Sequence, residues 1–335
     1  MKILEDYSLK SHNTFGIDAR CKRFVEYASV QEACTVARRL SEPFLIIGGG
    51  SNLLLTRDFP GTVVRSAILG MEVVHESADE VRVRVGSGEE WDRVVGLFVE
   101  RGWHGAENLS LIPGDVGASA VQNIGAYGAE VCELIDQVEA VRIGDGQPVT
   151  FRSADCQYGY RQSRFKQEWK NRYLITHVVY RLPLSFQPRL DYGNLRSELE
   201  RRGIVQPTAA QLRQVVIDIR RAKLPDPREL GNAGSFFMNP VVGRAQFQSL
   251  LAQYPSMPHY YVDEQHEKIP AGWMIDQCGW KGRTVGRAGV HDKQALVLVN
   301  RGGATGSEIA DLCQLIRHDV FARFGIEINP EVNII

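Results

Sequence analysis

The most informative part of this chain is a glycine-rich stretch, Ile112-Pro113-Gly114-Asp115-Val116-Gly117-Ala118-Ser119-Ala120-Val121-Gln122-Asn123-Ile124-Gly125-Ala126-Tyr127-Gly128. Its four glycines and the small residues around Asn123 leave backbone N–H groups uncovered. A main chain of this kind can close on a large anionic group such as a pyrophosphate. We therefore interpret this stretch, the second glycine loop, as a cofactor cradle.

A first glycine loop lies upstream, where an apolar run at 44–47 ends in Gly48-Gly49-Gly50-Ser51-Asn52. A buried strand that enters a glycine turn is a common way to bring backbone donors against phosphate oxygens. Turn chemistry alone also explains a glycine triplet. The cofactor interpretation therefore depends on the two loops together.

Neither loop fits the commoner nucleotide signatures. The chain contains no G-x-G-x-x-G and no G-x-x-x-x-G-K-[S/T] motif, so a Rossmann dinucleotide site and a P-loop both lack their residues. We expect the cofactor to be held in another way.

The composition is that of an ordinary globular chain. Its 335 residues are 44% hydrophobic and 24% charged, which is enough for a sizeable core in two or three domains. The formal net charge is −1, and no run of Lys and Arg is interleaved with aromatic residues. Nucleic acid is therefore not an expected partner.

The first residues and the thiols indicate the compartment. Acidic residues follow Met1 where a secretory peptide has its apolar stretch, and no segment approaches the ~18 apolar residues of a membrane span. We expect a cytoplasmic protein with no membrane partner. The cysteines lack a C-x-x-C pair, so we expect reduced thiols; they are Cys21, Cys34, Cys132, Cys156, Cys278 and Cys313. His259 and His266 form the closest histidine pair, without a metal-ligand motif, and no metal is expected.

Hydrophobic periodicity predicts alternating helices and strands in the first 200 residues. Two small α/β units are expected, divided near residue 66. The predicted elements are a helix at 31–40, strands at 44–47, 62–65 and 81–85, a helix at 91–100, and strands near 138–143 and 173–180.

A helix is predicted from Ala209. Leu212, Val215, Val216 and Ile219 fall on one face, which leaves Arg213, Gln214, Arg220 and Arg221 pointing outward. The helix is expected to end near Lys223, because Pro225 and Pro227 in the following loop cannot continue it.

A second long helix is predicted near the end of the chain. A capping box is predicted at Thr305-Gly306-Ser307-Glu308, and Gly325 is predicted to be the C-terminal cap. An extended tail at 326–335 follows.

Several motifs in this order resemble one family of enzymes. They are Asn13-Thr14-Phe15-Gly16, the two glycine loops, Tyr158-Gly159-Tyr160-Arg161, Asp191-Tyr192-Gly193, Lys223-Leu224-Pro225-Asp226-Pro227, Gly231-Asn232-Ala233-Gly234-Ser235-Phe236-Phe237, Asn239-Pro240 and Pro330-Glu331-Val332. The chain resembles the UDP-N-acetylenolpyruvoylglucosamine reductases, flavoenzymes of bacterial peptidoglycan precursor synthesis, in the subtype with a tyrosine-bearing substrate loop.

The resemblance implies an α+β fold: a two-subdomain FAD-binding fold of the vanillyl-alcohol-oxidase/PCMH type and a C-terminal α/β substrate-binding domain. The implied boundaries are 1–66 and 67–203 for FAD-binding subdomains 1 and 2, 204–325 for the substrate domain, and 326–335 for a tail that returns to the flavin side. The implied ligands are non-covalent FAD, NADPH as co-substrate and UDP-N-acetylglucosamine enolpyruvate. No obligate protein partner is implied.

In the implied reaction, NADPH reduces FAD, and a hydride then passes to the enolpyruvyl double bond. Arg161 would grip the substrate carboxylate with paired hydrogen bonds. Ser235 would deliver the proton, provided that its conjugate base is stabilised. Glu331 would act with Arg161 on the same carboxylate, either protonated or with the arginine between the two carboxyl groups.

The resemblance also implies two sets of binding residues. The cofactor set is Gly48, Gly49, Gly50, Ser51, Asn52, Pro113, Gly114, Gly117, Ser119, Asn123, Gly125 and Tyr127. The substrate set is Tyr160, Tyr192, Lys223, Asn239 and Gln294.

The chain departs from the family pattern at Asp115, where relatives more often have Thr. A carboxylate beside a pyrophosphate repels it unless the carboxylate points away.

Two other functions stay open. One is an oxidase of the wider flavoprotein superfamily, in which molecular oxygen would quickly reoxidise the flavin. The other is a nucleotide-sugar sensor without turnover. The presence of Arg161, Ser235 and Glu331 together argues against the sensor.

Overall fold

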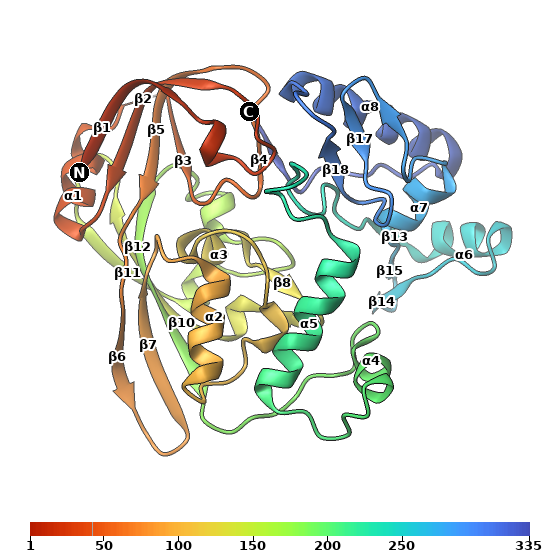
Figure 1. Cartoon of the computed structure of the whole chain (residues 1–335), viewed down its shortest axis with the longest axis horizontal. Coiled ribbons are helices and arrows are strands. Elements are labelled where there is room, and N and C mark those ends of the chain that lie inside the picture. The colour runs from red at the N-terminus through yellow and green to blue at the C-terminus, as the bar shows by residue number, and fades with distance from the viewer. Residues whose placement is uncertain (42) are drawn as a thin grey trace. The chain divides into compact units, whose positions relative to one another are not determined.

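The computed structural model describes residues 1–41 and 43–335 (Figure 1). The chain divides into two compact units. The first comprises residues 1–7, 21–49 and 60–220, and the second comprises residues 8–20, 50–59 and 221–335.

A four-stranded sheet opens the first unit, in the order β1-β2-β5-β3. The strands are β1 (Lys2–Ser8), β2 (Arg20–Tyr27), β3 (Phe44–Ile47) and β5 (Phe59–Ser66). Helix α1 (Val30–Arg39) is capped at its N-terminus by Ser29, whose hydroxyl accepts the N–H of Glu32 at 3.1 Å. The helix predicted at 31–40 and the strands predicted at 44–47 and 62–65 are therefore confirmed, with a longer strand at the last position.

A larger antiparallel sheet follows, in the order β11-β10-β12-β7-β6. Its strands are β6 (Met71–Glu76), β7 (Glu80–Gly86), β10 (Ile135–Arg142), β11 (Pro148–Arg152) and β12 (Tyr173–Pro183). The alternation at 81–85 turns the valines into the core and the arginines to the other face. Helix α2 (Trp91–Glu100), as predicted, packs Trp91, Val94 and Phe98 into the same cluster as the valines.

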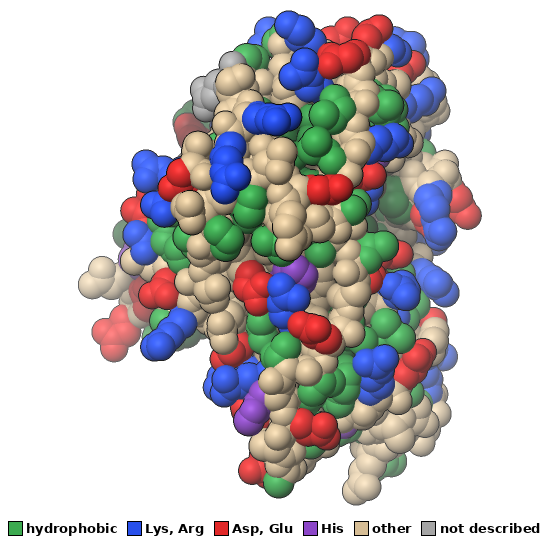
Figure 2. Space-filling model, turned by 90° about the vertical axis from the view of Figure 1, so that its left-hand side faces the viewer, with side chains coloured by type: hydrophobic (Ala, Val, Ile, Leu, Met, Phe, Trp, Pro, Cys, Tyr) green, Lys and Arg blue, Asp and Glu red, His purple; other side chains and the backbone are tan. Residues whose placement is uncertain are grey.

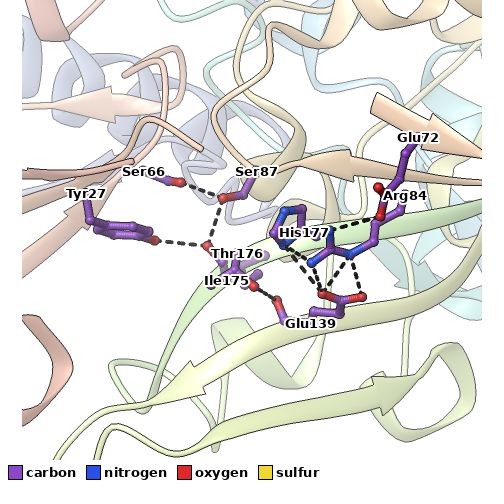
Figure 3. A network of polar contacts seen from close by, with 9 residues as sticks. All are labelled: Tyr27, Ser66, Glu72, Arg84, Ser87, Glu139, Ile175, Thr176 and His177. Carbon is purple, nitrogen blue, oxygen red and sulfur yellow. Dashed lines mark hydrogen bonds and ion pairs between the residues drawn. The ribbon is translucent and has the colours of Figure 1, made fainter. Parts of the chain in front are cut away.

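A buried polar network ties this sheet to the glycine-rich segments (Figure 3). The carbonyl oxygen of Ile175 accepts hydrogen bonds from the hydroxyls of Tyr27 and Ser87, both at 2.9 Å. The hydroxyls of Ser87 and Ser66 lie 2.6 Å apart. The carbonyl of Ser87 in turn accepts the N–H of Gly117 at 2.9 Å. The network therefore positions the second glycine loop against the sheet.

A charged cluster occupies the other face of the same sheet (Figure 3). The guanidinium of Arg84 lies 2.7 Å from Glu139 and 3.3 Å from Glu72. It also lies 2.8 Å from the Nδ1 atom of His177. Burial and the Arg84 charge lower the pKa of His177. Acidic and basic side chains are interspersed over the face shown in Figure 2, as the near-zero net charge suggests.

The first unit ends in α4 (Leu195–Arg201) and α5 (Ala209–Lys223). The predicted apolar face of α5 is buried, with Leu212, Val215, Val216 and Ile219 in one cluster. The prediction that Arg213 and Arg220 point outward is wrong. Arg213 is bonded to Asp92 of α2, and Arg220 to the carbonyl of Leu111. Periodicity describes a helix by itself and does not anticipate a second layer that covers its polar face.

The second unit is built of short strands and helices. Its sheets have the orders β13-β15-β14, β16-β17-β18 and β19-β4. Their strands are β4 (Leu53–Leu54), β13 (Val241–Gly243), β14 (Tyr260–Asp263), β15 (His266–Lys268), β16 (Thr284–Val285), β17 (Ala288–Val290), β18 (Leu298–Asn300) and β19 (Asn333–Ile334). The helices are α6 (Arg244–Gln253), α7 (Ala271–Gln277) and α8 (Gly306–Phe324).

The predicted caps of α8 are confirmed. The Thr305 hydroxyl accepts the N–H of Glu308 at 3.2 Å, and the Glu308 carboxylate accepts the N–H of Thr305 at 2.8 Å. Gly325 ends the helix at a φ of 64°. In the part of the chain that the structure describes, no helix has both the length and the apolar character to cross a bilayer.

Candidate active site

The two glycine loops approach each other closely within the first unit. A β-carbon placed on Gly48 would lie 3.1 Å from the Cβ of Ala118. One on Gly49 would lie 3.1 Å from the Cα of Gly114. Because real Cβ atoms are rarely this close to other atoms, larger residues at these positions would push the loops apart. The structure thus brings together segments that are more than 60 positions apart in the sequence.

Asp115 lies at this junction, with its side chain 10% exposed. Its Oδ1 atom would lie 3.1 Å from a β-carbon on Gly49, and its Oδ2 atom is 3.4 Å from Arg65. Burial raises the pKa of Asp115 to about 6, against the opposing effect of Arg65. The carboxylate therefore faces the first glycine loop, and Arg65 balances part of its charge.

Asn123 joins the second glycine loop to the segment of Arg161. Its amide nitrogen donates to the carbonyl of Gly159 at 2.8 Å and to the carboxylate of Glu130 at 2.9 Å. Its side-chain oxygen accepts the N–H of Cys132 at 3.2 Å. Asn123 is fully buried and left-handed, with a φ of 43°. Asparagine tolerates this conformation better than most residues, which explains the residue type at this position.

The Arg161 guanidinium lies against the second glycine loop. It donates to the carbonyls of Asn123, at 3.3 Å, and of Gly125. A β-carbon on Gly125 would lie 2.6 Å from the guanidinium, so a larger residue would displace it. The ring of Tyr160 stacks with the guanidinium at 5.2 Å. The structure therefore places the predicted carboxylate-binding group beside the predicted cofactor cradle.

Three other predicted residues of the first unit have different surroundings. The hydroxyl of Ser119 is buried and bonded to the carbonyl of Val116 at 2.7 Å and to the hydroxyl of Tyr180 at 3.0 Å. Tyr127 is left-handed at a φ of 48°, and burial raises its pKa. Tyr192 is exposed and lies against Gly128, where a β-carbon would come within 3.1 Å of the tyrosine.

Ser235 belongs to the second unit and is exposed. Gly234, at a φ of 68°, turns the chain before it, and the fully buried Phe236 anchors the chain after it. The N–H of Phe236 donates to the carbonyl of Leu296 at 2.7 Å. The hydroxyl is therefore presented at the surface by a backbone that is fixed on both sides.

The tail that carries Glu331 runs beside this segment. The N–H of Glu331 donates to the carbonyl of Phe236 at 2.8 Å, and Pro330 pairs with Phe237. On its other side, the carbonyl of Glu331 accepts the amide of Asn52 at 3.3 Å. The tail therefore brings Ser235, Glu331 and the end of the first glycine loop together.

The remaining predicted residues of the second unit lie near α7 or at the end of α5. The side-chain oxygen of Asn239 accepts the N–H of Ala271 at 2.9 Å. That of Gln294 would lie 3.3 Å from a β-carbon on Gly272. Both amides therefore lie at the start of α7. Lys223 is the exposed last residue of α5.

Gly50 begins the part of the first glycine loop that belongs to the second unit. Its φ is 67°, and a β-carbon there would lie 2.0 Å from the carbonyl of His12. Only glycine fits this position. The carbonyl oxygen of Gly50 accepts the N–H of Thr14 at 3.2 Å, so the predicted motif at 13–16 supports the first glycine loop.

The sequence reasoning missed Asp92, which bonds both Leu111 and Arg213. The sequence does contain a sign of such a partner, because Arg213 and Arg220 are seven positions apart and therefore lie on one side of α5.

The two histidines of the closest pair have separate acidic partners. His259 lies 3.1 Å from Glu267, and His266 lies 2.9 Å from Asp263. Among residues 1–41 and 43–335 no cluster of ligands could hold a metal ion.

The first unit's glycine segments fit a dinucleotide cofactor. Gly49 and Gly114 face each other without β-carbons, so a phosphate can reach the main chain at these two positions. Within the described ranges, the N–H groups of Gly49 and Gly114 donate no hydrogen bond to another residue. The donors that an anionic cofactor needs are therefore available.

Comparisons with known proteins agree with this geometry. Residues 23–152 match the family model for an FAD binding domain, and residues 226–335 match that for the C-terminal domain of UDP-N-acetylenolpyruvoylglucosamine reductase. A UDP-N-acetylenolpyruvoylglucosamine reductase from Bacteroides fragilis is 55% identical over 333 residues and covers 99% of each chain. One from Burkholderia multivorans is 50% identical over 337 residues, covering 99% of this chain and 96% of the other.

The fold is similar to that of a solved structure. The UDP-N-acetylenolpyruvylglucosamine reductase from Thermus caldophilus superimposes with a TM-score of 0.71 at 21% identity, covering 100% of this chain and 99% of the other. The predicted α+β fold class is confirmed. Because the reductases from Bacteroides fragilis and Burkholderia multivorans are 55% and 50% identical over nearly the whole length, the chain belongs to the UDP-N-acetylenolpyruvoylglucosamine reductase family of FAD-dependent oxidoreductases.

Proposed function

We propose that this chain reduces UDP-N-acetylglucosamine enolpyruvate to UDP-N-acetylmuramate in peptidoglycan synthesis, with non-covalent FAD as its cofactor and NADPH as the source of the hydride. Family membership supports the reaction, and the match at 23–152 supports the cofactor. When bound, the flavin supplies the two-electron chemistry that carries a hydride from the nicotinamide to the substrate double bond.

The observation that carries the proposal is the pairing of the tail with the segment of Ser235, through the 2.8 Å hydrogen bond from the N–H of Glu331 to the carbonyl of Phe236. This bond supports a shared site for a proton donor and a carboxyl group that are 96 positions apart in the sequence. The Ser235 hydroxyl would give its proton to the carbon beside the substrate carboxylate.

Arg161 would hold the substrate carboxylate and stabilise the negative charge that develops next to it. Its charge persists at any working pH, and its anchoring to the carbonyls of Asn123 and Gly125 supports a fixed orientation. Glu331 would act on the same carboxylate, either protonated or with Arg161 between the two carboxyl groups.

The binding sets are proposed on the same basis. Backbone groups of the two glycine loops, with Asn52, Asn123 and Tyr127, would hold FAD. Tyr160, Tyr192, Lys223, Asn239 and Gln294 would hold the nucleotide sugar, because a lysine suits diphosphate charge and amides suit sugar and uracil edges. In this scheme 1–66 and 67–203 bind FAD, 204–325 bind substrate, and 326–335 form a tail that returns to the flavin side.

An anaerobic absorbance experiment tests the proposal. NADPH is added to the purified protein until the flavin absorbance bleaches, and UDP-N-acetylglucosamine enolpyruvate is then added without oxygen. Return of the oxidised spectrum is the expected result. Bleaching that only air reverses would favour the oxidase, and a colourless protein that takes up no FAD would overturn the interpretation of both glycine loops.

A further inference from the structure

The backbone is strained immediately before the second glycine loop. Leu111 has a φ of 57°, in the left-handed region. A side chain with a β-carbon is disfavoured there because the β-carbon crowds the following carbonyl oxygen. The next residues, Ile112, Pro113 and Gly114, lead into the proposed cradle, so the conformation of Leu111 determines where that cradle starts.

This strain is part of a local pattern. Among the residues that the structure describes, seven other than glycine have a left-handed φ. Five of them lie in or next to the segments of the candidate site: Leu111, Asn123, Tyr127, Gln157 and Arg161. Such conformations persist only where the surroundings hold them, and they gather at functional sites. The contacts that hold Leu111 are therefore candidates for a functional role.

Asp92, in the first turn of α2, holds the N–H of Leu111. Its Oδ1 atom accepts that N–H at 2.6 Å and the guanidinium of Arg213 at 2.6 Å. Arg213 also donates to the backbone carbonyl of Asp92 at 3.2 Å. The two side chains are mostly buried, at 22% and 17% exposure, so water competes weakly for these bonds.

This pair joins helices α2 and α5, which run side by side in Figure 1. Gly96 lies one turn along α2, and a β-carbon there would lie 3.4 Å from the Arg213 guanidinium. Arg213 therefore passes directly over Gly96 as it reaches across α2 to Asp92.

The strained residue is anchored on its other sides as well. Its carbonyl oxygen accepts the Nε of Arg220 at 3.3 Å. The indole of Trp91 donates to the carbonyl of Leu109 at 2.9 Å, and the backbone N–H of Trp91 donates to that of Gly114 at 2.9 Å. These contacts fix positions before and after Leu111, and Asp92 is the side chain that holds the N–H of Leu111 itself.

We propose that Asp92 and Arg213 are positioning residues for the cofactor: Asp92 holds Leu111 in the left-handed conformation that directs 112–114 toward the FAD site, and Arg213 fixes the Asp92 carboxylate. The inference rests on the proposed function. It concerns side chains that have no assigned part in the reaction.

Titration of the full-length, flavin-free protein with FAD, followed by quenching of flavin fluorescence, tests this role. Asp92→Ala should weaken FAD binding about tenfold, because binding must then drive Leu111 back into its disfavoured conformation. Adding Leu111→Gly to this variant should recover most of the affinity, since glycine adopts a positive φ without penalty. A pair that served stability alone would not be rescued in this way.

A control and a second variant complete the experiment. Asp218→Ala breaks an ion pair of similar length on α5, the helix that carries Arg213; Asp218 lies 2.7 Å from Arg202, and its loss should leave FAD affinity unchanged. If Asp92→Ala fails to fold, Asp92→Asn keeps the acceptor oxygen, loses the charge that fixes it to Arg213, and should weaken binding about threefold.

The results distinguish a failure of the positioning role from a failure of the proposed function. Unchanged affinity in the folded Asp92 variant overturns the positioning role while the proposed function stands. Weak binding that Leu111→Gly does not recover also overturns it. A wild-type protein that binds no FAD overturns the proposed function itself, and the positioning role with it.

Discussion

Replacement of Asp115 by asparagine should stabilise the protein, in a way that depends on pH. Burial raises the pKa of Asp115 from 3.8 to about 6, so the folded chain binds this proton more tightly than the unfolded chain does. The ionised carboxylate therefore opposes folding above pH 6, and the penalty fades as the pH falls toward 4. By proton linkage, that difference in pKa corresponds to about 3 kcal/mol at pH 8 and about 1.5 kcal/mol at pH 5.

Asparagine resembles the protonated acid in size, so the substitution removes the charge and little else. The neighbouring charges belong to Arg65, which lowers the pKa, and Glu90, which raises it, and the net shift already contains both. We expect Asp115→Asn to raise the free energy of unfolding by up to about 3 kcal/mol at pH 8 and by about half as much at pH 5.

Urea unfolding of the flavin-free protein, followed by tryptophan fluorescence at several pH values, measures this difference. Asp311→Asn, at an exposed position of α8, is a matched control that should change stability by less than about 0.5 kcal/mol at every pH. A stabilisation by Asp115→Asn that is the same at pH 5 and pH 8, or a loss of stability at pH 8, would show that the ionised Asp115 carboxylate does not destabilise the folded chain. Because a negative charge beside the cradle is also removed, FAD affinity at pH 8 should rise.

Three further substitutions address the chemistry, the cradle and the caps. Ser235→Ala should leave reduction of the flavin by NADPH intact but lower steady-state turnover by about 10²- to 10⁴-fold; equal turnover in a stopped-flow and steady-state comparison would remove Ser235 from the mechanism. Gly49→Ala adds a methyl group 3.1 Å from Asp115, so calorimetric titration should show weaker FAD binding, with about 1–3 kcal/mol of stability lost. Thr305→Ala removes the cap of α8 and should cost about 1 kcal/mol in urea unfolding, whereas Thr305→Ser should retain most of it.

Local pattern was sufficient for much of the secondary structure. The apolar run at 44–47 and the amphipathic segment at 91–100 became a strand and a helix with the predicted bounds, because both signals are contained in a few consecutive residues. The capping box at Thr305 is equally local. The glycine loops and the Tyr158–Arg161 motif could be recognised in the same way, by residue type and order.

The polar face of α5 shows where such reasoning fails. A helical wheel assigns Arg213 and Arg220 to solvent, yet Arg213 bonds an aspartate 121 positions away and Arg220 bonds a carbonyl 109 positions away. Nothing in the neighbouring residues encodes the partner, since its position follows from how α2 and the second glycine loop pack. Asp115 is similar, because its burial follows from the tertiary structure, and that burial raises its pKa to about 6 against the opposing effect of Arg65.

The amino-acid sequence was enough to recognise the two glycine loops, the amphipathic helices with their caps, and the family to which the motifs belong. Which of these segments meet, such as Gly49 with Gly114 and the N–H of Glu331 with the carbonyl of Phe236, could be seen only in the folded chain. The physical reason is that caps and periodicity are satisfied within a turn or two of chain. Close approach of distant backbones depends instead on the packing of whole sheets and helices, which no short segment contains.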